Sequence, residues 1–107
     1  MRHPEELVLE VTSGPCDNAH HRISANEEFI VGRDRMSSCY IMDPRLSRQH
    51  FVIAVCGCRW VVRDLKSANG TFVNGELITV CKLNSKDIIQ AGDTMFRVYL
   101  EPMSIRI

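Results

Sequence analysis

Four polar side chains in three turn-like segments have the chemistry needed to bind a phosphate group. Arg33 and Arg48 carry planar guanidinium groups that donate paired hydrogen bonds to phosphate or carboxylate oxygens, and Ser47 adds a hydroxyl donor. Asn69 has a carbonyl and an amide NH2, so it can pair with a peptide group both as acceptor and as donor. Brought together, these residues predict a site that holds a dianion and aligns the peptide carrying it.

Two Asn-Gly pairs lie within residues 64–75, and we expect them to serve different purposes. An Asn-Gly pair between apolar runs is typical of a tight hairpin turn, because both residues accept a positive φ. Asn74-Gly75 lies between such runs and predicts a type I′ turn, with a ligand contact as an additional role. Asn69-Gly70 is flanked by small polar residues and is expected to shape a loop that holds a ligand. The sequence lacks the pattern G-x4-G-K-[ST], so a nucleotide phosphate is not the expected ligand.

The elements that must position these loops are predicted to be short β-strands. Apolar residues either alternate with polar ones or form short runs, and most runs end at glycine, asparagine or aspartate. No stretch shows sustained apolar spacing at three and four residues, so no amphipathic helix is predicted. The predicted strands lie at 7–12, 28–31, 40–42, 51–56, 60–62, 71–73, 76–78, 87–90 and 95–100, and the last two are expected to be joined by a turn at Ala91-Gly92.

Short strands at even intervals with glycine-rich turns indicate an all-β fold, a two-sheet β-sandwich. The length of 107 residues suits one domain, which we expect to span residues 1–107. Alternate connections of a sandwich gather at the same end, so the three polar loops are expected to converge there. Residues 16–27 and 101–107 have the weakest pattern, and His20 and His21 are interpreted as solvated loop residues.

Composition excludes several classes of protein. Hydrophobic residues make up 45% of the chain, so a packed core is expected and disorder is not. Thirteen basic and thirteen acidic residues cancel, which argues against general binding to nucleic acid or to an anionic membrane. The first residues lack the apolar stretch of a signal peptide, and the longest apolar run is too short to cross a bilayer. These features predict an intracellular protein, cytoplasmic or, in a eukaryote, nuclear.

The five cysteines are expected to be reduced thiols, because their number is odd and no export signal precedes them. Cys56 and Cys58 flank a glycine and suggest half of a metal site. The chain offers no second pair with the spacing that zinc sites use. We therefore expect no metal and no cofactor, and interpret this pair as small hydrophobic residues at a strand end.

The order and spacing of the polar motifs closely resemble the forkhead-associated (FHA) domain family. The resemblance rests on Gly32-Arg33, on residues 46–50 (LSRQH), on residues 64–75 (DLKSANGTFVNG), on Lys86-Asp87-Ile88-Ile89 and on Gly92-Asp93. It covers about residues 7–100, and the combined order of the motifs is specific although each alone is weak. The resemblance implies an eleven-stranded sandwich that binds phosphothreonine peptides through loops at one end.

Carried over by position, the resemblance assigns phosphopeptide-binding roles to five residues. Arg33 and Ser47 would contact the phosphate, and Arg48 would contact the phosphate or the peptide. Asn69 would hold the peptide backbone near the phosphothreonine, while Asn74 would lie beside the peptide or support the loop. Structural support of the binding loops is expected from Gly32, His50, Ser67, Gly70 and Thr71, with His50 bracing the loops.

One position departs from the family pattern. The residue before the loop asparagine is often threonine or serine, whose hydroxyl reaches the phosphate, but here it is Ala68. Ser67 lies one position earlier and need not replace that contact. Two hypotheses follow: a phosphothreonine-dependent module of Ser/Thr kinase signalling, or a constitutive, phospho-independent interaction or scaffold domain. The intact Arg33, Ser47 and Asn69 favour the first, and Ala68 favours the second.

An enzyme is a third hypothesis, and the sequence disfavours it. Ser47 and His50, with Asp43 or Asp64 as a third member, have the residue types of a hydrolase triad. Ser47 lacks the flanking glycines of the nucleophile elbow, and no oxyanion hole is indicated. The resemblance implies a phosphothreonine-containing protein or peptide as the partner, and the balanced net charge argues against a nucleic acid or a membrane.

Overall fold

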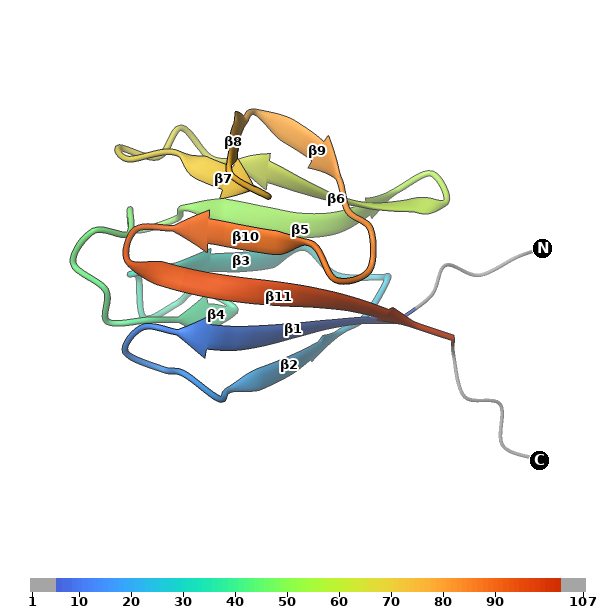
Figure 1. The fold of residues 1–107 in the computed structure, drawn as a ribbon, viewed down its shortest axis with the longest axis horizontal. Coiled ribbons are helices and arrows are strands. Elements are labelled where there is room, and N and C mark those ends of the chain that lie inside the picture. Colours follow the sequence, from blue (N-terminus) through green and yellow to red (C-terminus); the bar gives the residue numbers. More distant parts are fainter. Residues whose placement is uncertain (1–5, 103–107) are drawn as a thin grey trace.

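The computed structural model describes residues 6–102 and arranges them as eleven β-strands in two packed sheets (Figure 1). The six-stranded sheet has the order β2-β1-β11-β10-β7-β8, and the five-stranded sheet has the order β4-β3-β5-β6-β9. The predicted all-β sandwich is thereby confirmed. The strands are β1 (Glu6–Ser13), β2 (His20–Ile23), β3 (Phe29–Gly32), β4 (Cys39–Tyr40), β5 (Phe51–Cys56), β6 (Arg59–Asp64), β7 (Thr71–Val73), β8 (Glu76–Ile78), β9 (Val80–Lys82), β10 (Ile88–Ala91) and β11 (Thr94–Glu101).

The hydrophobic core lies between the two sheets, where the inward-facing residues of the alternating strands are fully buried. Phe51 of β5 and Phe96 of β11 meet edge to face across the sandwich, with ring centroids 5.4 Å apart. This arrangement of aromatic rings contributes about 0.5–1.5 kcal/mol beyond the burial of their area. Trp60 is 3% exposed and belongs to this core.

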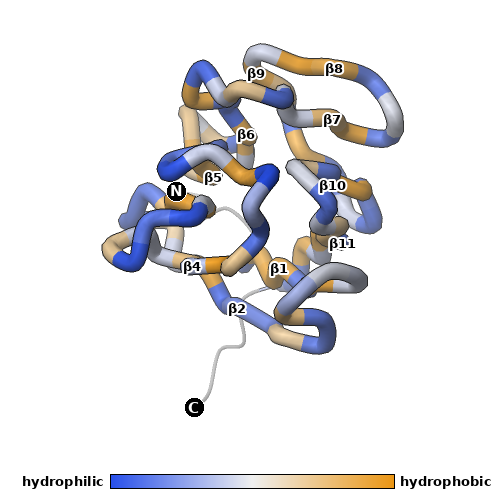
Figure 2. Tube along the Cα trace, turned by 90° about the vertical axis from the view of Figure 1, so that its left-hand side faces the viewer, coloured by the Kyte–Doolittle hydropathy of each residue, from blue (hydrophilic) through white to orange (hydrophobic). Residues whose placement is uncertain are grey.

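One end of the sandwich collects the loops that carry the candidate site. We call this end the rim and define it by loops 33–38, 41–50 and 65–70 together with the turn at 92–93. These connections lie on the left of Figure 1, and Figure 2 looks directly onto them. Much of the chain at the rim is coloured as hydrophilic in Figure 2, in contrast to the apolar strands behind it.

Two strands lie where the sequence predicts none. β2 falls within the weakly patterned residues 16–27, and β9 follows β8 after a single residue. Both are edge strands, and β2 buries only its last residue, Ile23, so alternation is too weak to reveal them. His20 and His21 therefore lie on β2 rather than in a loop, which corrects our expectation.

Smaller differences concern strand ends. β4 ends at Tyr40, although Ile41 is fully buried and its N–H donates to the carbonyl of Gly32 at 3.0 Å. Ala91 pairs with Thr94, so the hairpin turns at Gly92-Asp93 rather than at the predicted Ala91-Gly92. The predicted turn at Asn74-Gly75 is confirmed, because the two residues have φ values of 51° and 85°.

Neither a membrane-spanning helix nor a disulfide is found within residues 6–102. Within residues 6–102 no helix has the length and apolar character needed to cross a bilayer. All five cysteines are free thiols. Cys39 is buried, and this burial raises the pKa of its thiol to about 11.

Candidate functional site

Arg33 stands at the start of the loop between β3 and β4 and is exposed at the rim. Its backbone N–H donates to the Ser47 carbonyl at 3.0 Å, and its Nε donates to the Leu46 carbonyl at 2.9 Å. These two bonds fix the base of the side chain against the β4–β5 loop. The terminal nitrogens of the guanidinium have no protein partner among residues 6–102, so they are available to an anion.

Ser47 links two loops while keeping its hydroxyl proton free. Its Oγ accepts a hydrogen bond from the backbone N–H of Ala68 at 2.9 Å, and its own N–H donates to Nδ1 of His50 at 3.0 Å. A hydroxyl has one donor and two acceptor positions, and the Ala68 contact uses only an acceptor. The Ser47 hydroxyl therefore remains a donor next to Arg33.

His50 is completely buried beneath these loops. Because Nδ1 accepts from Ser47, the other nitrogen, Nε2, carries the proton and donates to the carbonyl of Gly70 at 2.8 Å. The imidazole thus joins the β4–β5 loop to the β6–β7 loop in one tautomer.

Asp64, the last residue of β6, organises the β6–β7 loop. Its Oδ1 accepts from the hydroxyls of Ser67 at 2.5 Å and Thr71 at 2.7 Å, and its Oδ2 accepts from the N–H of Ser67 at 3.1 Å. The hydroxyl of Ser67 in turn accepts from the N–H of Gly70 at 2.9 Å. These bonds hold residues 64–71 as a compact loop that presents Asn69 at its tip.

Asn69 is exposed and points back across the rim. Its Nδ2 donates to the carbonyl of Arg45 at 2.8 Å, which spans the β6–β7 and β4–β5 loops. Its carbonyl oxygen has no protein partner within the described chain and can accept from a ligand. Arg48 is likewise exposed, and its guanidinium has no partner among residues 6–102.

The structure places Asn74 apart from the other four candidate binding residues. It lies at the far end of β7 from Gly70, about 13 Å away at roughly 3.3 Å per strand residue. Both atoms of its side-chain amide are occupied: Nδ2 donates to Asp87 at 3.0 Å, and Oδ1 accepts from the N–H of Ile88 at 2.9 Å. Its side chain therefore fastens the β7–β8 turn to the start of β10.

Asp43 is a supporting residue that sequence reasoning missed. It is fully buried and accepts from the N–H of Arg45 at 2.9 Å, the N–H of Asp93 at 2.8 Å and the hydroxyl of Thr94 at 2.7 Å. It thereby clamps the β4–β5 loop to the β10–β11 turn. Asp64 is a second support that sequence reasoning missed, although the Asp-x-x-Ser spacing that it begins is a recognisable sign of a side chain bonding to its own loop.

Hydrogen bonding keeps the carboxyl groups of Asp43 and Asp64 ionised. Burial alone would raise the pKa of Asp43, but hydrogen bonds from Thr94, Arg45 and Asp93 outweigh it, so its pKa lies below the ordinary value of 3.8. Burial also opposes ionisation of Asp64, where bonds from Ser67 and Thr71 lower the pKa below the same value. Each carboxylate is therefore charged at neutral pH and contributes stability in that form.

We expect acid to destabilise the fold through these two groups. Since their pKa values are lowered in the folded state, their contribution is fully present above pH 3.8 and is lost as the pH falls through the folded-state values. Urea unfolding between pH 7 and pH 2.5 should show this loss, and Asp64→Asn should reduce its size. Asp17→Asn, at an exposed carboxylate whose side chain has no hydrogen bond within residues 6–102, is the control, and an equal effect of both substitutions would contradict the assignment.

The geometry does not form a hydrolase triad. The bond between Ser47 and His50 uses the backbone N–H of Ser47, not its hydroxyl. Neither Asp43 nor Asp64 accepts a hydrogen bond from the His50 ring, whose protonated nitrogen is engaged by Gly70. Activation of a serine nucleophile requires a base at hydrogen-bond distance, and the Ser47 hydroxyl has none among the described residues 6–102. Within residues 6–102, no group of three or more His, Cys, Asp or Glu side chains is placed to hold a metal ion.

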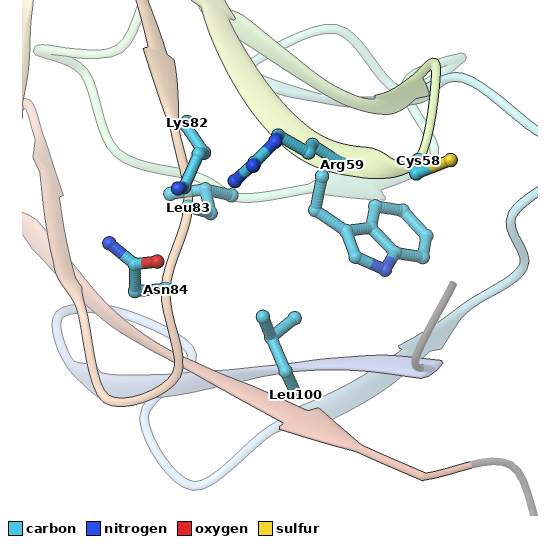
Figure 3. Close-up of a pocket in the computed structure, with 7 residues that line it drawn as sticks. Cys58, Arg59, Lys82, Leu83, Asn84 and Leu100 are labelled. Carbon is cyan, nitrogen blue, oxygen red and sulfur yellow. The ribbon is translucent and has the colours of Figure 1, made fainter.

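A separate hollow of about 170 Å³ lies away from the rim, between β6, the chain after β9, and β11 (Figure 3). Leu83, Leu100 and Trp60 line it, with Arg59 and Lys82 at its edge. It shares no residue with the rim, so it takes no part in the candidate site.

Comparison with known proteins places the chain in a family. The FHA domain profile matches residues 29–92. The FHA domain-containing protein FhaB of Mycobacterium tuberculosis is 32% identical over 79 residues, which are 73% of this chain and 49% of FhaB. The chain therefore spans about half the length of this relative.

Solved structures agree with this match. An FHA domain of an Arabidopsis thaliana protein superposes with a TM-score of 0.89 at 27% identity, covering 97% of this chain and 92% of that one. An FHA domain from a study of phosphothreonine-dependent interactions superposes with a TM-score of 0.83 at 26% identity, covering 92% and 99%. With its eleven strands and its rim of polar loops, the chain belongs to the FHA domain family.

Proposed function

We propose that the protein is a binding module that recognises phosphothreonine-containing protein segments in Ser/Thr kinase signalling. The observation that carries the proposal is the meeting of Arg33 and Ser47 at the rim, each with a hydrogen-bond donor that the protein leaves unused. A guanidinium beside a hydroxyl suits the three oxygens and the double charge of a phosphate monoester.

The four rim residues divide the recognition of the peptide. Arg33 and Ser47 donate to the phosphate, and Arg48 is the second cation that can reach the phosphate or the peptide. Asn69 accepts from the peptide backbone through its free carbonyl oxygen, while its amide stays bonded to Arg45. This split fixes the peptide's direction across the rim, because the phosphate and one backbone group are held at separate points.

A second set of residues supports these contacts. Gly32 and His50 hold the β3–β4 and β4–β5 loops, whereas Ser67, Gly70 and Thr71 shape the β6–β7 loop through Asp64 and His50. We assign Asn74 to this supporting set, because its amide is fully engaged by the β10 end and lies away from the rim.

Ala68 reduces the donors at the phosphate without dismantling the site. Its backbone N–H is already used by Ser47, and its methyl group offers no hydroxyl. The charge of the phosphate is then balanced by Arg33 and Arg48. The alternative function, phospho-independent scaffolding, draws on this same missing contact and predicts binding that does not change on dephosphorylation.

Relatives support a phosphate-dependent function. The solved FHA domain with a TM-score of 0.83 is described as taking part in phosphothreonine-dependent interactions. The proposed role in kinase signalling also implies an intracellular location, since the partner must meet a Ser/Thr kinase.

Binding to a degenerate phosphothreonine peptide library, before and after phosphatase treatment, tests the proposal directly. We expect dephosphorylation to weaken binding at least tenfold, because each hydrogen bond to a charged group contributes about 1.5–3 kcal/mol. A matched phosphoserine library should bind less tightly, as the resemblance implies a preference for threonine. Equal binding after phosphatase treatment would establish the scaffold alternative instead.

The affinity should also depend on pH through the ligand. The second pKa of a phosphate monoester is about 6, so the dianion is about tenfold depleted at pH 5, and binding should weaken to a similar degree between pH 7.5 and pH 5. A difluorophosphonate analogue with a lower second pKa separates the ligand from the protein, because its midpoint should move to lower pH. Flat binding over this range, or an unmoved midpoint, would speak against recognition of the dianion.

A further inference from the structure

The hollow of about 170 Å³ drawn in Figure 3 lies toward the end of the sandwich opposite the rim (Figure 1). Its walls come from the start of β6, from the chain after β9 and from Leu100 near the end of β11. The buried Trp60 and Leu83 and the half-buried Leu100 supply its apolar surface. Pockets for whole small molecules usually measure about 300–1,000 Å³, so this hollow has room for a side chain rather than for a nucleotide or coenzyme.

Three polar side chains without a protein partner surround the hollow. Arg59, Lys82 and Asn84 are exposed, and none of their side chains forms a hydrogen bond or ion pair within residues 6–102. In Figure 3 they lie around the hollow, with Leu100 on the opposite side. No aspartate or glutamate of the described chain lines it. Two cations at one hollow repel each other, and an anion placed between them is attracted to both.

The basic character continues along the outer face of β6 and β9. Arg59, Val61 and Arg63 lie on this face, because the two residues that alternate with them are buried. In the neighbouring β9, Lys82 pairs with Val61, and Val80, which is 56% exposed, pairs with Arg63. Arg63 has no ion-pair partner within residues 6–102. Four residues of strand separate Arg59 from Arg63, which corresponds to about 13 Å.

We infer that the hollow and this outer face together bind an acidic segment of a partner protein. In an extended segment, one carboxylate enters the hollow between Arg59 and Lys82, and a second, four residues away, pairs with Arg63. The side chain midway between them lies on the same side of the segment and covers Val61 and Val80. The expected pattern is therefore acidic-x-aliphatic-x-acidic. This site requires no phosphate and does not rest on the proposed phosphothreonine binding.

A protein segment suits this surface better than other polyanions. A guanidinium pairs with a carboxylate through two parallel hydrogen bonds, and the amide of Asn84 can pair with a peptide group. A flat bilayer surface does not enter a recess, and the exposed Val80 offers nothing to a nucleic-acid backbone. Residues 103–107 of this chain carry one arginine and no acidic side chain, so charge does not favour them as the occupant.

The test uses a fluorescein-labelled, unphosphorylated peptide with glutamate at the first and fifth positions of the pattern and valine at the third. We expect the wild-type chain to bind it, as measured by fluorescence anisotropy, and raising the salt concentration from 50 to 200 mM to weaken binding. The double variant Arg59→Gln/Lys82→Gln should bind about 5- to 30-fold more weakly, because two exposed ion pairs are lost. Its affinity for a phosphothreonine peptide should not change, and a thermal unfolding curve checks its fold.

Lys86→Gln/Arg97→Gln is the matched control, because it removes the same net charge. Neither residue lines the hollow, and both belong to the segments around β10 and β11 of the other sheet. We expect this variant to bind the glutamate peptide as the wild type does. A peptide with glutamine at both acidic positions should bind the wild type as weakly as the glutamate peptide binds the Arg59→Gln/Lys82→Gln variant.

Two neighbouring thiols locate the bound peptide. Cys58 and Cys56 are both exposed, but only Cys58 lines the hollow. A saturating amount of the glutamate peptide should therefore slow the alkylation of Cys58 by N-ethylmaleimide several-fold relative to that of Cys56, as followed by mass spectrometry. Equal protection of both thiols, or of neither, would contradict binding in the hollow.

The remaining outcomes also decide the inference. Absence of binding, equal binding of the glutamate and glutamine peptides, or an equal loss in both double variants would overturn it and leave the proposed phosphothreonine function standing. Co-sedimentation with phosphatidylserine vesicles that Arg59→Gln/Lys82→Gln abolishes, without any binding of the glutamate peptide, would identify the surface as a membrane contact instead.

Discussion

Replacing Arg33 with alanine is expected to weaken phosphothreonine-peptide binding by about 30- to 1000-fold. The guanidinium can form two hydrogen bonds to the phosphate, and because Arg48 stays beside the phosphate in the variant, we expect a net loss of roughly 2–4 kcal/mol, less than the sum of two separate bonds. The backbone N–H of residue 33 keeps its bond to Ser47 in the variant, so the loop itself should stay in place. Isothermal titration with one phosphopeptide gives the affinity, and a thermal unfolding curve shows that the fold is retained.

Arg35→Ala is the matched control for this experiment. Arg35 lies two residues further along the same loop, is exposed and has no hydrogen-bond or ion-pair partner among residues 6–102. Its replacement removes the same net charge, and we expect less than a threefold change in affinity. A similar loss in both variants would show that the rim attracts phosphate only through its general positive charge, which contradicts a specific role for Arg33.

Gly32→Ala is expected to destabilise the fold by about 3 kcal/mol or more and to abolish binding. A Cβ at this position would lie 2.0 Å from the carbonyl oxygen of Arg48, 2.7 Å from its carbonyl carbon and 3.0 Å from the Cα of Gln49. All three atoms belong to the backbone, so no side-chain rotation can relieve the clash. The chain must separate β3 from the β4–β5 loop, which carries Ser47.

Urea unfolding measures this effect, and Gly57→Ala provides the comparison. Gly57 has nothing within 4 Å of the position of an added Cβ, and only its φ of +66° opposes substitution. That conformation costs an alanine about 1–2 kcal/mol. If Gly32→Ala were no more destabilising than Gly57→Ala, the close approach of the two loops would not be required for the fold.

Much of the fold can be predicted from the sequence, because the central strands carry strong signals. Residues 7–12, 51–56 and 95–100 form apolar stretches of strand length, and the turn at Asn74-Gly75 has the two residues that accept positive φ. The edge strands β2 and β9 lack such signals. Their position is set mainly by hydrogen bonds from β1 and β6, because Ile23 is the only residue of these two strands that is buried.

In the candidate site, too, only some of the residues can be predicted from the sequence. The rim residues Arg33, Ser47 and Asn69 follow from residue type and family resemblance. The supports do not, because they depend on contacts between distant segments. Asp43 accepts from the N–H of Asp93, which lies 50 residues further along the chain, and no local sequence pattern predicts that bond. The orientation of Asn74 toward Asp87 and Ile88 cannot be predicted from the sequence either, because it depends on how β7 pairs with β10.

The placement of β1 and β11, the first and last strands along the chain, has a practical consequence. Glu6 at the start of β1 pairs with Glu101 at the end of β11, on the side of the sandwich opposite the rim (Figure 1). A linker attached to either strand therefore starts at the end of the sandwich opposite the recognition loops. Domains immobilised on a sensor surface through such a linker keep their loops facing solvent. Two copies tethered in tandem could each hold one mark on a doubly phosphorylated target, which would raise avidity without any new contact.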